Sequence, residues 1–335
     1  MPSTVFVSGV AGFLGSHLAE TLRDAGHRVV GCDSLVGGER GNVPDGVEFH
    51  ECDLNDHGRL RPLVRGAEVV YHAAALAHEG LSVFSPHLIT TNVFGATVSL
   101  LSASIAAGVR RFVFWSSMAR YGDGPVPFVE HMPPRPVDPY GIAKVAAEQA
   151  IATLCETHGT DYVIVVPHNL IGPRQKYDDP YRNVVAIMMN LMLQGRQPVI
   201  YGDGKQRRCF SYIGDIVPLF EPLGFQPNLR GEVINIGPDD ELVTLNEVAE
   251  MVAGLMGFDL DPVYLAARPA DVREANCSAE KARRLLGYRT RYELRAGLAL
   301  MLAWMRARGP RPFRYHLDIE IASALTPLTW AERLL

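Results

Sequence analysis

Two residues with acid–base chemistry, Tyr140 and Lys144, are four positions apart at the start of a predicted helix. This spacing places both side chains on one face of the helix. A phenol ordinarily has a pKa of about 10, and a neighbouring ammonium favours its ionised form. Tyr140 could therefore act as a base toward a hydroxyl group at neutral pH.

Two hydroxyls precede this pair, in the stretch WSSMARYG at residues 115–122. Ser116 and Ser117 follow a predicted buried strand, and ligands of parallel sheets bind at such strand ends. The next two residues, Met118 and Ala119, can neither donate nor accept a proton. The stretch therefore supplies hydroxyls without an acid or a base, and we expect Met118 to form a wall of the pocket.

A glycine-rich turn, GxxGxxG at Gly9, Gly12 and Gly15, joins the first predicted strand to the first predicted helix. Glycines let the backbone approach a pyrophosphate closely, and the helix N-terminus adds N–H groups and partial positive charge. Asp33 ends the second predicted strand, where a carboxylate binds both ribose hydroxyls and repels a 2′-phosphate. The pattern predicts a dinucleotide site that takes NAD rather than NADP.

Strands and helices alternate through the first half of the chain, which predicts a parallel sheet covered by helices on both faces. The expected fold class is α/β, a Rossmann-type doubly wound parallel sheet with a smaller mixed C-terminal substrate lobe. Asp53 and Leu54 end the third strand and are expected beside the adenine. The expected strands are residues 4–8, 28–33, 46–54, 67–75, 110–117 and 161–169, and the expected helices are residues 16–25, 58–66, 92–107 and 143–158.

The second half of the chain has a looser pattern of elements. We expect residues 1–170 to form the NAD-binding domain and residues 171–335 to form a substrate-binding lobe interwoven with it. Residues from about 210 to 240 should return to complete the sheet, because EVINIG is typical of a buried strand. The last residues, 312–335, are expected to form an extended arm that lies over a partner or over the same domain.

The overall composition argues against several classes of protein. The chain has 335 residues, 47% hydrophobic and 21% charged, and a formal net charge of −5, so no nucleic-acid partner is expected. The five cysteines have no CxxC spacing, which argues against a disulfide framework and against a metal site. No apolar run approaches the roughly 20 residues of a membrane span, and no signal peptide precedes the first strand. A cytoplasmic protein without a membrane partner is therefore the expectation.

Taken together, these motifs resemble the extended short-chain dehydrogenase/reductase superfamily, in its branch of NAD-dependent nucleotide-sugar epimerases and dehydratases. Within that branch the pattern is most similar to that of UDP-glucose (UDP-hexose) 4-epimerases. The resemblance runs from Gly9 to about Tyr288. It is carried by the stretches GVAGFLG, HAAALA, SSMARYG, YGIAK, PHNLIGPRQ, YGDGKQRRCFSYIGDI and ARPADV.

The resemblance implies a role for each matching residue. Ser117 would hold the sugar oxygen under attack, Tyr140 would be the base, and Lys144 would bind the nicotinamide ribose and tune the tyrosine. Asn92 would support the active-site helix. The residues implied for NAD are Gly9, Gly12, Phe13, Leu14, Gly15, Asp33, Asp53, Leu54, Ala73, Ala74, Ala75, Asn92, Ser116, Tyr140, Lys144 and Pro167. The residues implied for the nucleotide sugar are Ala77, Ser117, Met118, Tyr140, Asn169, Asn183, Val184, Val199, Ile200, Tyr201, Arg208, Arg268, Asp271 and Ala275.

The residues of the second set divide by the part of the substrate that they match. Arg208 and Arg268 match groups on the sugar diphosphate, for which a guanidinium is suited in charge and geometry. Asp271 matches a residue of the family that contacts the nucleoside ribose. Asn183 and residues 199–201 match the positions that bind uracil. Ala275 is small where a tyrosine would exclude an N-acetyl group at C2 of the sugar.

Two histidines need separate treatment, because either could be taken for a ligand. His72 lies in a predicted strand and is expected to be structural. His168, beside Pro167, lies nearer the nicotinamide end, and its role stays open.

Three reactions share this scaffold, and Met118 and Ala119 favour one of them. A 4,6-dehydratase needs an acid and a base directly after the hydroxyl, and a decarboxylase has a glutamate nearby. Neither residue type stands there, and the nearest carboxylates in sequence are Asp123 and Glu130. An epimerase is therefore expected; the alternatives are a dehydratase or decarboxylase, a simple sugar reductase, and a non-catalytic NAD and nucleotide-sugar binding protein.

The resemblance also implies a homodimer, since most members of the superfamily pair through two helices each into a four-helix bundle. Here those helices would be residues 92–107 and 143–158. The first is rich in Val, Leu and Ala on more than one face, which is consistent with a surface covered by a partner.

Overall fold

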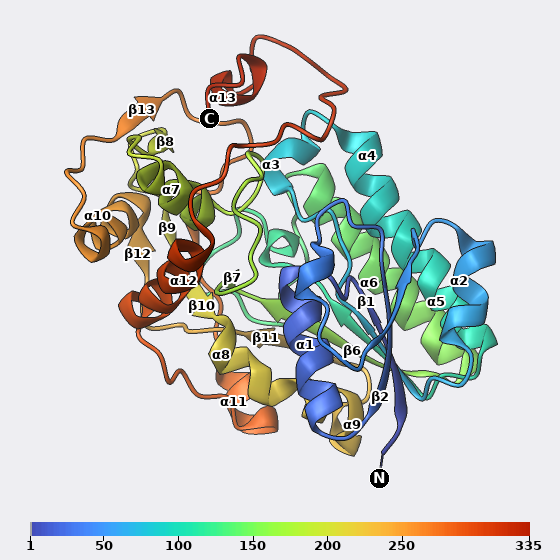
Figure 1. Cartoon of the computed structure of the whole chain (residues 1–335). Helices are drawn as coiled ribbons and strands as arrows, with labels where there is room; N and C mark the ends of the chain where they lie inside the picture. The colour runs from blue at the N-terminus through green and yellow to red at the C-terminus, as the bar shows by residue number, and fades with distance from the viewer. Residues whose placement is uncertain (1) are drawn as a thin grey trace.

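Seven strands form the central sheet, in the order β11-β6-β5-β4-β1-β2-β3, and every neighbouring pair is parallel (Figure 1). The computed structural model describes residues 2–335. The strand order reverses between β1 and β4, and ligands of such sheets bind at this switch point. The strands are β1 (Thr4–Ser8), β2 (Arg28–Asp33), β3 (Glu48–Glu51), β4 (Val69–His72), β5 (Arg111–Trp115), β6 (Asp161–Pro167) and β11 (Glu232–Ile236).

Helices cover both faces of this sheet, and each face has its own buried cluster of apolar side chains (Figure 1). Phe6 points into the cluster under α2, α5 and α6, whereas Val5 and Val7 point into the cluster under α1, α8, α9 and α11. This double burial is the reason that the central strands are almost wholly apolar. The helices are α1 (Phe13–Asp24), α2 (His57–Val64), α3 (Glu79–Ser82), α4 (Pro86–Thr90), α5 (Ala96–Ala106), α6 (Pro139–His158), α8 (Ile213–Ile216), α9 (Phe220–Phe225) and α11 (Glu280–Leu286).

The smaller lobe packs three further helices around a third buried cluster, which includes Met188, Met189 and Met192. The short strands after β6 form two sheets of two strands and one sheet of three strands, and β11 returns to the central sheet to lie beside β6. The division into two domains at residue 170 stays a prediction. The remaining elements are α7 (Val184–Leu193), α10 (Leu245–Met256), α12 (Leu294–Arg308), α13 (Leu328–Ala331), β7 (Asn169–Ile171), β8 (Val199–Tyr201), β9 (Arg207–Arg208), β10 (Phe210–Tyr212), β12 (Val243–Thr244), β13 (Val263–Leu265) and β14 (Glu274–Ala275).

Helix α6 begins four residues before the apolar pattern predicts. Asp138 caps it, and its carboxylate accepts a hydrogen bond from the backbone N–H of Gly141 at 2.9 Å. Pro139 occupies the first helical position, where its missing N–H costs nothing. The cap therefore places Tyr140 in the first turn of the helix.

The helix expected at residues 92–107 also begins earlier, at Pro86, and it runs through a π-helical segment at Thr91–Gly95 to the end of α5. By length and composition this helix, Pro86–Ala106, is apolar enough to cross a membrane, with a mean hydropathy of 1.5. The expectation that no apolar segment approaches that length is therefore wrong. The fold uses part of the apolar surface, because Leu100 and Leu101 are fully buried against the sheet.

The C-terminal arm, residues 312–335, folds back over its own chain (Figure 1). The Glu320 carboxylate accepts hydrogen bonds from two backbone N–H groups at the start of α4, at 2.9 and 2.8 Å. Trp330, in the short helix α13, donates its indole N–H to the carbonyl of Pro180 at 3.0 Å. Of the two placements expected for the arm, the structure shows contact with the same chain.

A buried arginine at the start of β5 is expected to be a large contributor to stability. Arg111 bonds to the Asp161 carboxylate at 2.8 Å and to two backbone carbonyls, and its side chain is almost fully buried. Arg111→Met leaves the carboxylate and the carbonyls without their donor, so we expect a loss of about 3–5 kcal/mol in the free energy of unfolding. Urea denaturation measures this loss. The neighbouring Arg110→Met removes a solvent-exposed ion pair with Glu68 and one hydrogen bond to the carbonyl of Gly224, so it should cost only about 1–2 kcal/mol; equal losses would contradict the assignment.

Candidate active site

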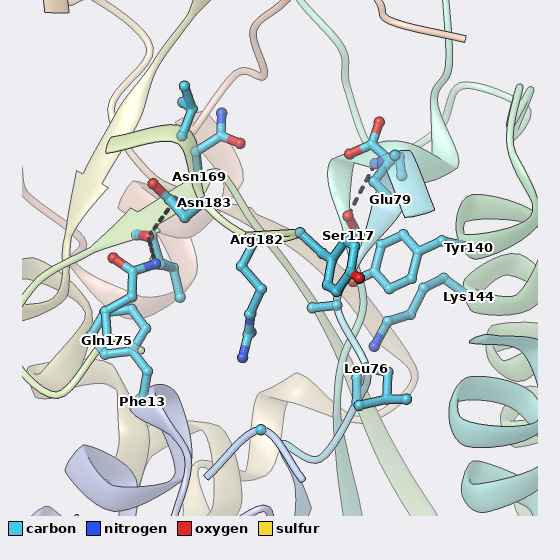
Figure 2. A pocket seen from close by; sticks show the side chains of 18 of the residues that line it. Phe13, Leu76, Glu79, Ser117, Tyr140, Lys144, Asn169, Gln175, Arg182 and Asn183 are labelled. Atoms are coloured by element: carbon cyan, nitrogen blue, oxygen red, sulfur yellow. Dashed lines mark hydrogen bonds between the residues drawn. The ribbon is translucent and has the colours of Figure 1, made fainter. Parts of the chain in front are cut away.

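A cavity of about 460 Å³ opens at the carboxyl ends of the central strands and extends between the sheet and the smaller lobe. Every residue that the sequence implies for NAD or for the nucleotide sugar lines this one cavity. Their individual roles stay predictions. In Figure 2, Ser117, Tyr140 and Lys144 lie on one side of the cavity, and Asn169, Gln175 and Asn183 lie on the other. Arg182 projects between the two sides.

The glycine turn forms a cradle that has no room for side chains. A Cβ atom on Gly15 would lie 2.0 Å from the carbonyl oxygen of Gly9. Gly9 itself has φ +74°, and a Cβ there would lie 2.8 Å from the backbone of Ala74. Such a bare backbone at the N-terminus of α1 is what a pyrophosphate requires, so the turn fits NAD.

The carboxylate of Asp33 lies at the end of β2, above this turn. It accepts hydrogen bonds from the backbone N–H groups of Ala11 at 3.0 Å and Leu35 at 2.8 Å. Burial raises the pKa of Asp33, while these backbone donors lower it. The two N–H groups fix the carboxylate and leave further lone pairs on its oxygens for the ribose hydroxyls of NAD.

The catalytic candidates converge from β5 and α6. Lys144 donates to the carbonyl of Trp115 at 2.7 Å, and its Nζ lies 5.7 Å from the centre of the Tyr140 ring. Burial lowers the pKa of Lys144 to about 7, and the Glu148 carboxylate partly offsets this. The arrangement holds the ammonium behind the phenol, as the spacing of the two residues predicts.

The pKa of Tyr140 differs from the expectation based on the lysine alone. Burial raises it above its usual range, the Ser117 hydroxyl lowers it and the Glu79 carboxylate raises it further. In the protein by itself, desolvation of the phenolate is therefore the largest influence on the pKa of Tyr140. A phenolate at Tyr140 thus depends on additional positive charge, which the nicotinamide ring of NAD carries.

A buried ion pair holds the Ser-Ser strand end in place. Arg120 bonds to Glu148 of α6 at 3.0 Å, and the Ser116 hydroxyl donates to the other oxygen of the same carboxylate. The Ser117 hydroxyl accepts from the backbone N–H of Ala119 at 3.1 Å, which closes a tight turn. Arg120, which belongs to the same stretch, therefore helps to hold the serine-containing strand end against α6. The sequence pattern did not indicate this role.

The residues expected at the diphosphate lie close together at the far end of the cavity. Arg208 bonds to Asp271 at 3.1 Å, and Arg268 lies 3.9 Å from the same carboxylate and over the ring of Tyr201. Ala275 pairs with Arg208 across two neighbouring strands. The pair of guanidiniums forms a positively charged end of the cavity, which suits a diphosphate.

Two asparagines expected at the site, Asn92 and Asn183, have hydrogen-bond partners within the protein. The side chain of Asn92 bonds to the carbonyl of Leu88 at 2.9 Å and to Asn55, and neither group belongs to α6. The π-helical segment that carries Asn92 packs against α6, and the expected support of the active-site helix by Asn92 stays a prediction. The side-chain oxygen of Asn183 accepts from the backbone N–H of Val185 and caps α7, and the expected place of Asn183 at uracil stays a prediction.

The two histidines behave differently from each other. His72 is buried and bonds to the hydroxyls of Ser8 at 2.8 Å and Thr97 at 2.9 Å, so its expected structural role is confirmed. His168 lines the cavity, and its Nδ1 lies 2.7 Å from the carbonyl of Pro238. Burial lowers the pKa of His168 to about 4, so the ring is neutral at physiological pH.

The carboxylates nearest to the site differ from those nearest in the sequence. Glu130 accepts from the backbone N–H of Asn235 at 3.0 Å, and neither it nor Asp123 lines the cavity. Glu79 and Asp138 line it instead. Glu79 is only two residues beyond Ala77, which the sequence places at the substrate, and this proximity was the available signal.

Metal chemistry has no obvious site in the part of the chain that the structure describes. Within residues 2–335, no group of three or more His, Cys, Asp or Glu side chains is placed to hold a metal ion. The five cysteines are free and buried.

Comparison with known proteins identifies the family. The model of the NAD dependent epimerase/dehydratase family matches residues 5–237. The chain belongs to this family. It is 35% identical over 311 residues to a UDP-glucose 4-epimerase of Mycolicibacterium smegmatis, which covers 90% of this chain and 97% of the relative.

Further comparisons show a shared fold and a range of reactions within the family. The UDP-glucose 4-epimerase of Thermus thermophilus in complex with NAD superposes with a TM-score of 0.84 at 32% identity, covering 90% of this chain and 99% of that one. A UDP-N-acetyl-alpha-D-glucosaminuronate decarboxylase of Bacillus cytotoxicus is 34% identical over 267 residues, covering 75% of this chain and 79% of the relative. Overall similarity thus establishes the fold and NAD as cofactor, and the choice of reaction depends on the side chains of the site.

Proposed function

We propose that the protein is an NAD-dependent 4-epimerase of a UDP-hexose. The observation that carries this proposal is that Ser117, Tyr140 and Lys144 line the same wall of the cavity. Met118 and Ala119 line the cavity beside them. The similarity to UDP-glucose 4-epimerases supports it. The family alternatives are a dehydratase or a decarboxylase, and a non-catalytic binding protein is the alternative outside enzymes.

The mechanism follows from the positions of the three side chains. Ser117 holds the C4 oxygen of the sugar, and Tyr140 removes the proton of the C4 hydroxyl as the C4–H bond breaks. NAD, held by the glycine turn and Asp33, would supply the hydride acceptor for C4 and the source of the returning hydride. The resulting 4-keto sugar turns over in the pocket, and Tyr140 gives the proton back to the oxygen after the hydride has reached the opposite face. Lys144 lies beside the phenol throughout, and in its protonated form it favours the phenolate.

Elimination of water is disfavoured by the wall that follows Ser117. A 4,6-dehydratase must move one proton at C5 and another at the C6 oxygen, so it needs an acid and a base there. Met118 and Ala119 are both buried and line the cavity, and neither side chain can donate or accept a proton. An epimerase needs no second pair of this kind, which is why the site supports epimerisation best.

The small side chain of Ala275 supports an extension of the substrate range to UDP-N-acetylhexosamines. Ala275 lines the cavity on β14, where a larger residue would fill space next to Arg208. A competition assay between UDP-glucose and UDP-N-acetylglucosamine tests this point. Turnover of both sugars supports it, and turnover of UDP-glucose alone would refute it.

We further propose a homodimer that pairs the α4–α5 helix and α6 of each subunit. The outer surface of these helices carries exposed Phe94 and Ile142, and Val98 and Val145 nearby are only half-buried. Covering such a surface with its copy would remove apolar area from water. Gel filtration with light scattering distinguishes a dimer from a monomer of 36.8 kDa.

The compartment that best suits this chemistry is the cytoplasm. The five cysteines are free and buried rather than paired, as is usual where thiols are kept reduced. Fractionation of cells that express the protein would test this assignment.

The proposed reaction is tested by incubating the purified protein with UDP-glucose and separating the nucleotide sugars by chromatography. Appearance of UDP-galactose, approached from either sugar, is the expected result. A 4-keto-6-deoxy sugar or a pentose product would indicate the dehydratase or decarboxylase alternative. Bound UDP-glucose without any product would indicate a binding protein.

A further inference from the structure

A carboxylate that the mechanism does not use, Glu79, faces the cavity from the short helix α3 (Figure 2). Its side chain is open to the cavity, yet protein surrounds it on the other sides. Within residues 2–335 the Glu79 carboxylate has no hydrogen bond and no ion pair at contact distance. An unpaired carboxylate that opens into a cavity is available to accept hydrogen bonds from a ligand.

The position of Glu79 is fixed by its neighbours along the chain. His78, on one side, bonds through Nε2 to the buried carboxylate of Asp179 at 2.9 Å. Ser82, at the other end of α3, bonds to Asp138, the cap of α6, at 3.3 Å. These two anchors fix the backbone of α3 beside the catalytic helix, so Glu79 extends from a fixed point on the cavity wall.

The charged groups around Glu79 indicate which part of a bound substrate would lie beside it. On one side it acts on the catalytic phenol of Tyr140 and raises the pKa of that group. On the other side the guanidiniums of Arg208 and Arg268 act on Glu79, and an Arg268 nitrogen packs over the adjacent Gly80. Glu79 thus lies between the group that attacks the sugar and the groups expected at the diphosphate. The hexose is the part of a nucleotide sugar that joins these two points.

We propose that Glu79 sets the charge specificity of the sugar subsite: its carboxylate accepts hydrogen bonds from a neutral hexose and excludes hexuronates. This inference rests on the proposed function. An ionised carboxylate is purely an acceptor, so it can pair with sugar hydroxyls, whereas the carboxylate of a uronate offers it only a like charge. Two like charges in one subsite repel each other, and this repulsion would favour binding of a neutral hexose over a hexuronate.

A further cation that lines the cavity, Arg182, does not offset the repulsion between Glu79 and the carboxylate of a uronate. Arg182 points away from Glu79, and its Nη1 lies near Gly37, on the side of the cofactor (Figure 2). Arg208 and Arg268 are shared with Asp271 and are expected at the diphosphate.

The discrimination should depend on pH. Burial raises the pKa of Glu79 to about 7, helped by the nearby carboxylates of Asp138 and Asp271 and opposed by Arg208 and Arg268. Glu79 is therefore ionised above about pH 7 and becomes neutral below it. Rejection of a uronate should be strongest on the alkaline side and should weaken as the pH falls.

The test measures binding and is independent of turnover. UDP, UDP-glucose and UDP-glucuronate are titrated calorimetrically into the NAD-loaded Tyr140→Phe protein, with and without Glu79→Gln. The neutral amide keeps the shape of the side chain and removes the charge. We expect Glu79→Gln to lower the ratio of the dissociation constants, UDP-glucuronate over UDP-glucose, by about 10-fold or more. Glu250→Gln, an exposed carboxylate on α10, is the matched control and should leave the ratio unchanged.

The possible outcomes separate the two proposals. If UDP and both sugars fail to bind, the proposed function is wrong. If both sugars bind and Glu79→Gln leaves their ratio unchanged, the assignment of Glu79 is wrong while the function stands. If Glu79→Gln does not fold, the ratio is measured in the Tyr140→Phe protein across pH 7; a ratio that does not fall with falling pH would overturn the proposal.

Discussion

Tyr140→Phe is expected to lower turnover by about 10²- to 10⁴-fold while NAD stays bound. The phenol is the group that takes the proton from the sugar hydroxyl, and phenylalanine keeps the ring that packs between Lys144 and the cavity wall. Only the proton-transfer step should therefore be lost. Turnover is measured with UDP-glucose, and NAD is quantified after its release by denaturation.

Tyr162→Phe is the matched control for this substitution. Its hydroxyl bonds to Glu156 at 3.2 Å, outside the cavity, so its removal should leave turnover within about twofold of the original. Full activity in Tyr140→Phe would show that another group moves the proton. Loss of NAD together with activity would show that Tyr140 is needed mainly to hold the cofactor.

Gly15→Ala is expected to abolish NAD binding and to lower the free energy of unfolding by about 1–3 kcal/mol. The new Cβ would lie 2.0 Å from the carbonyl oxygen of Gly9, and both partners of this clash belong to the backbone. The turn would have to move, and the N–H groups at the start of α1 would move with it. NAD content and thermal unfolding are measured on the same preparation.

Gly41→Ala is a suitable control for this prediction. A Cβ at Gly41 meets no heavy atom within 4 Å, so the same chemical change has room there. Retention of NAD by Gly41→Ala and its loss from Gly15→Ala would tie the effect to the turn. Normal NAD content in Gly15→Ala would contradict the close approach of backbone and pyrophosphate.

The parts of the fold that the sequence predicts well are those with local signals. The central strands are apolar on both faces, so residues 4–8 and 28–33 are recognisable without knowledge of their partners. The glycine turn and the Tyr140–Lys144 pair each depend on a short spacing along one element. The identities of the NAD-binding and catalytic candidates could be predicted for the same reason.

The parts that could not be predicted depend on residues far apart in the chain. Arg120 and Glu148 are separated by 28 positions, and the packing of α6 against the short 3-10 turn at Met118–Arg120 brings them together. Glu79 lies in a short helix that has no periodic pattern of its own, and its place between Tyr140 and Arg268 arises from three separate segments. The arm at 312–335 likewise contacts α4 across more than 230 residues, since Glu320 caps that helix.

The most direct test of the proposed reaction is proton NMR of the purified protein with UDP-glucose in deuterium oxide. Transient oxidation at C4 without a second acid–base pair predicts UDP-galactose that carries no deuterium on carbon, because the hydride lost from C4 is the one that returns. A 4-keto sugar dehydrated at C6, or deuterium at C5, would show that a second group in the site removes a carbon-bound proton. Either result would contradict the proposal that Tyr140 moves the only proton of the reaction and that Glu79 accepts hydrogen bonds from the sugar without removing a proton from carbon.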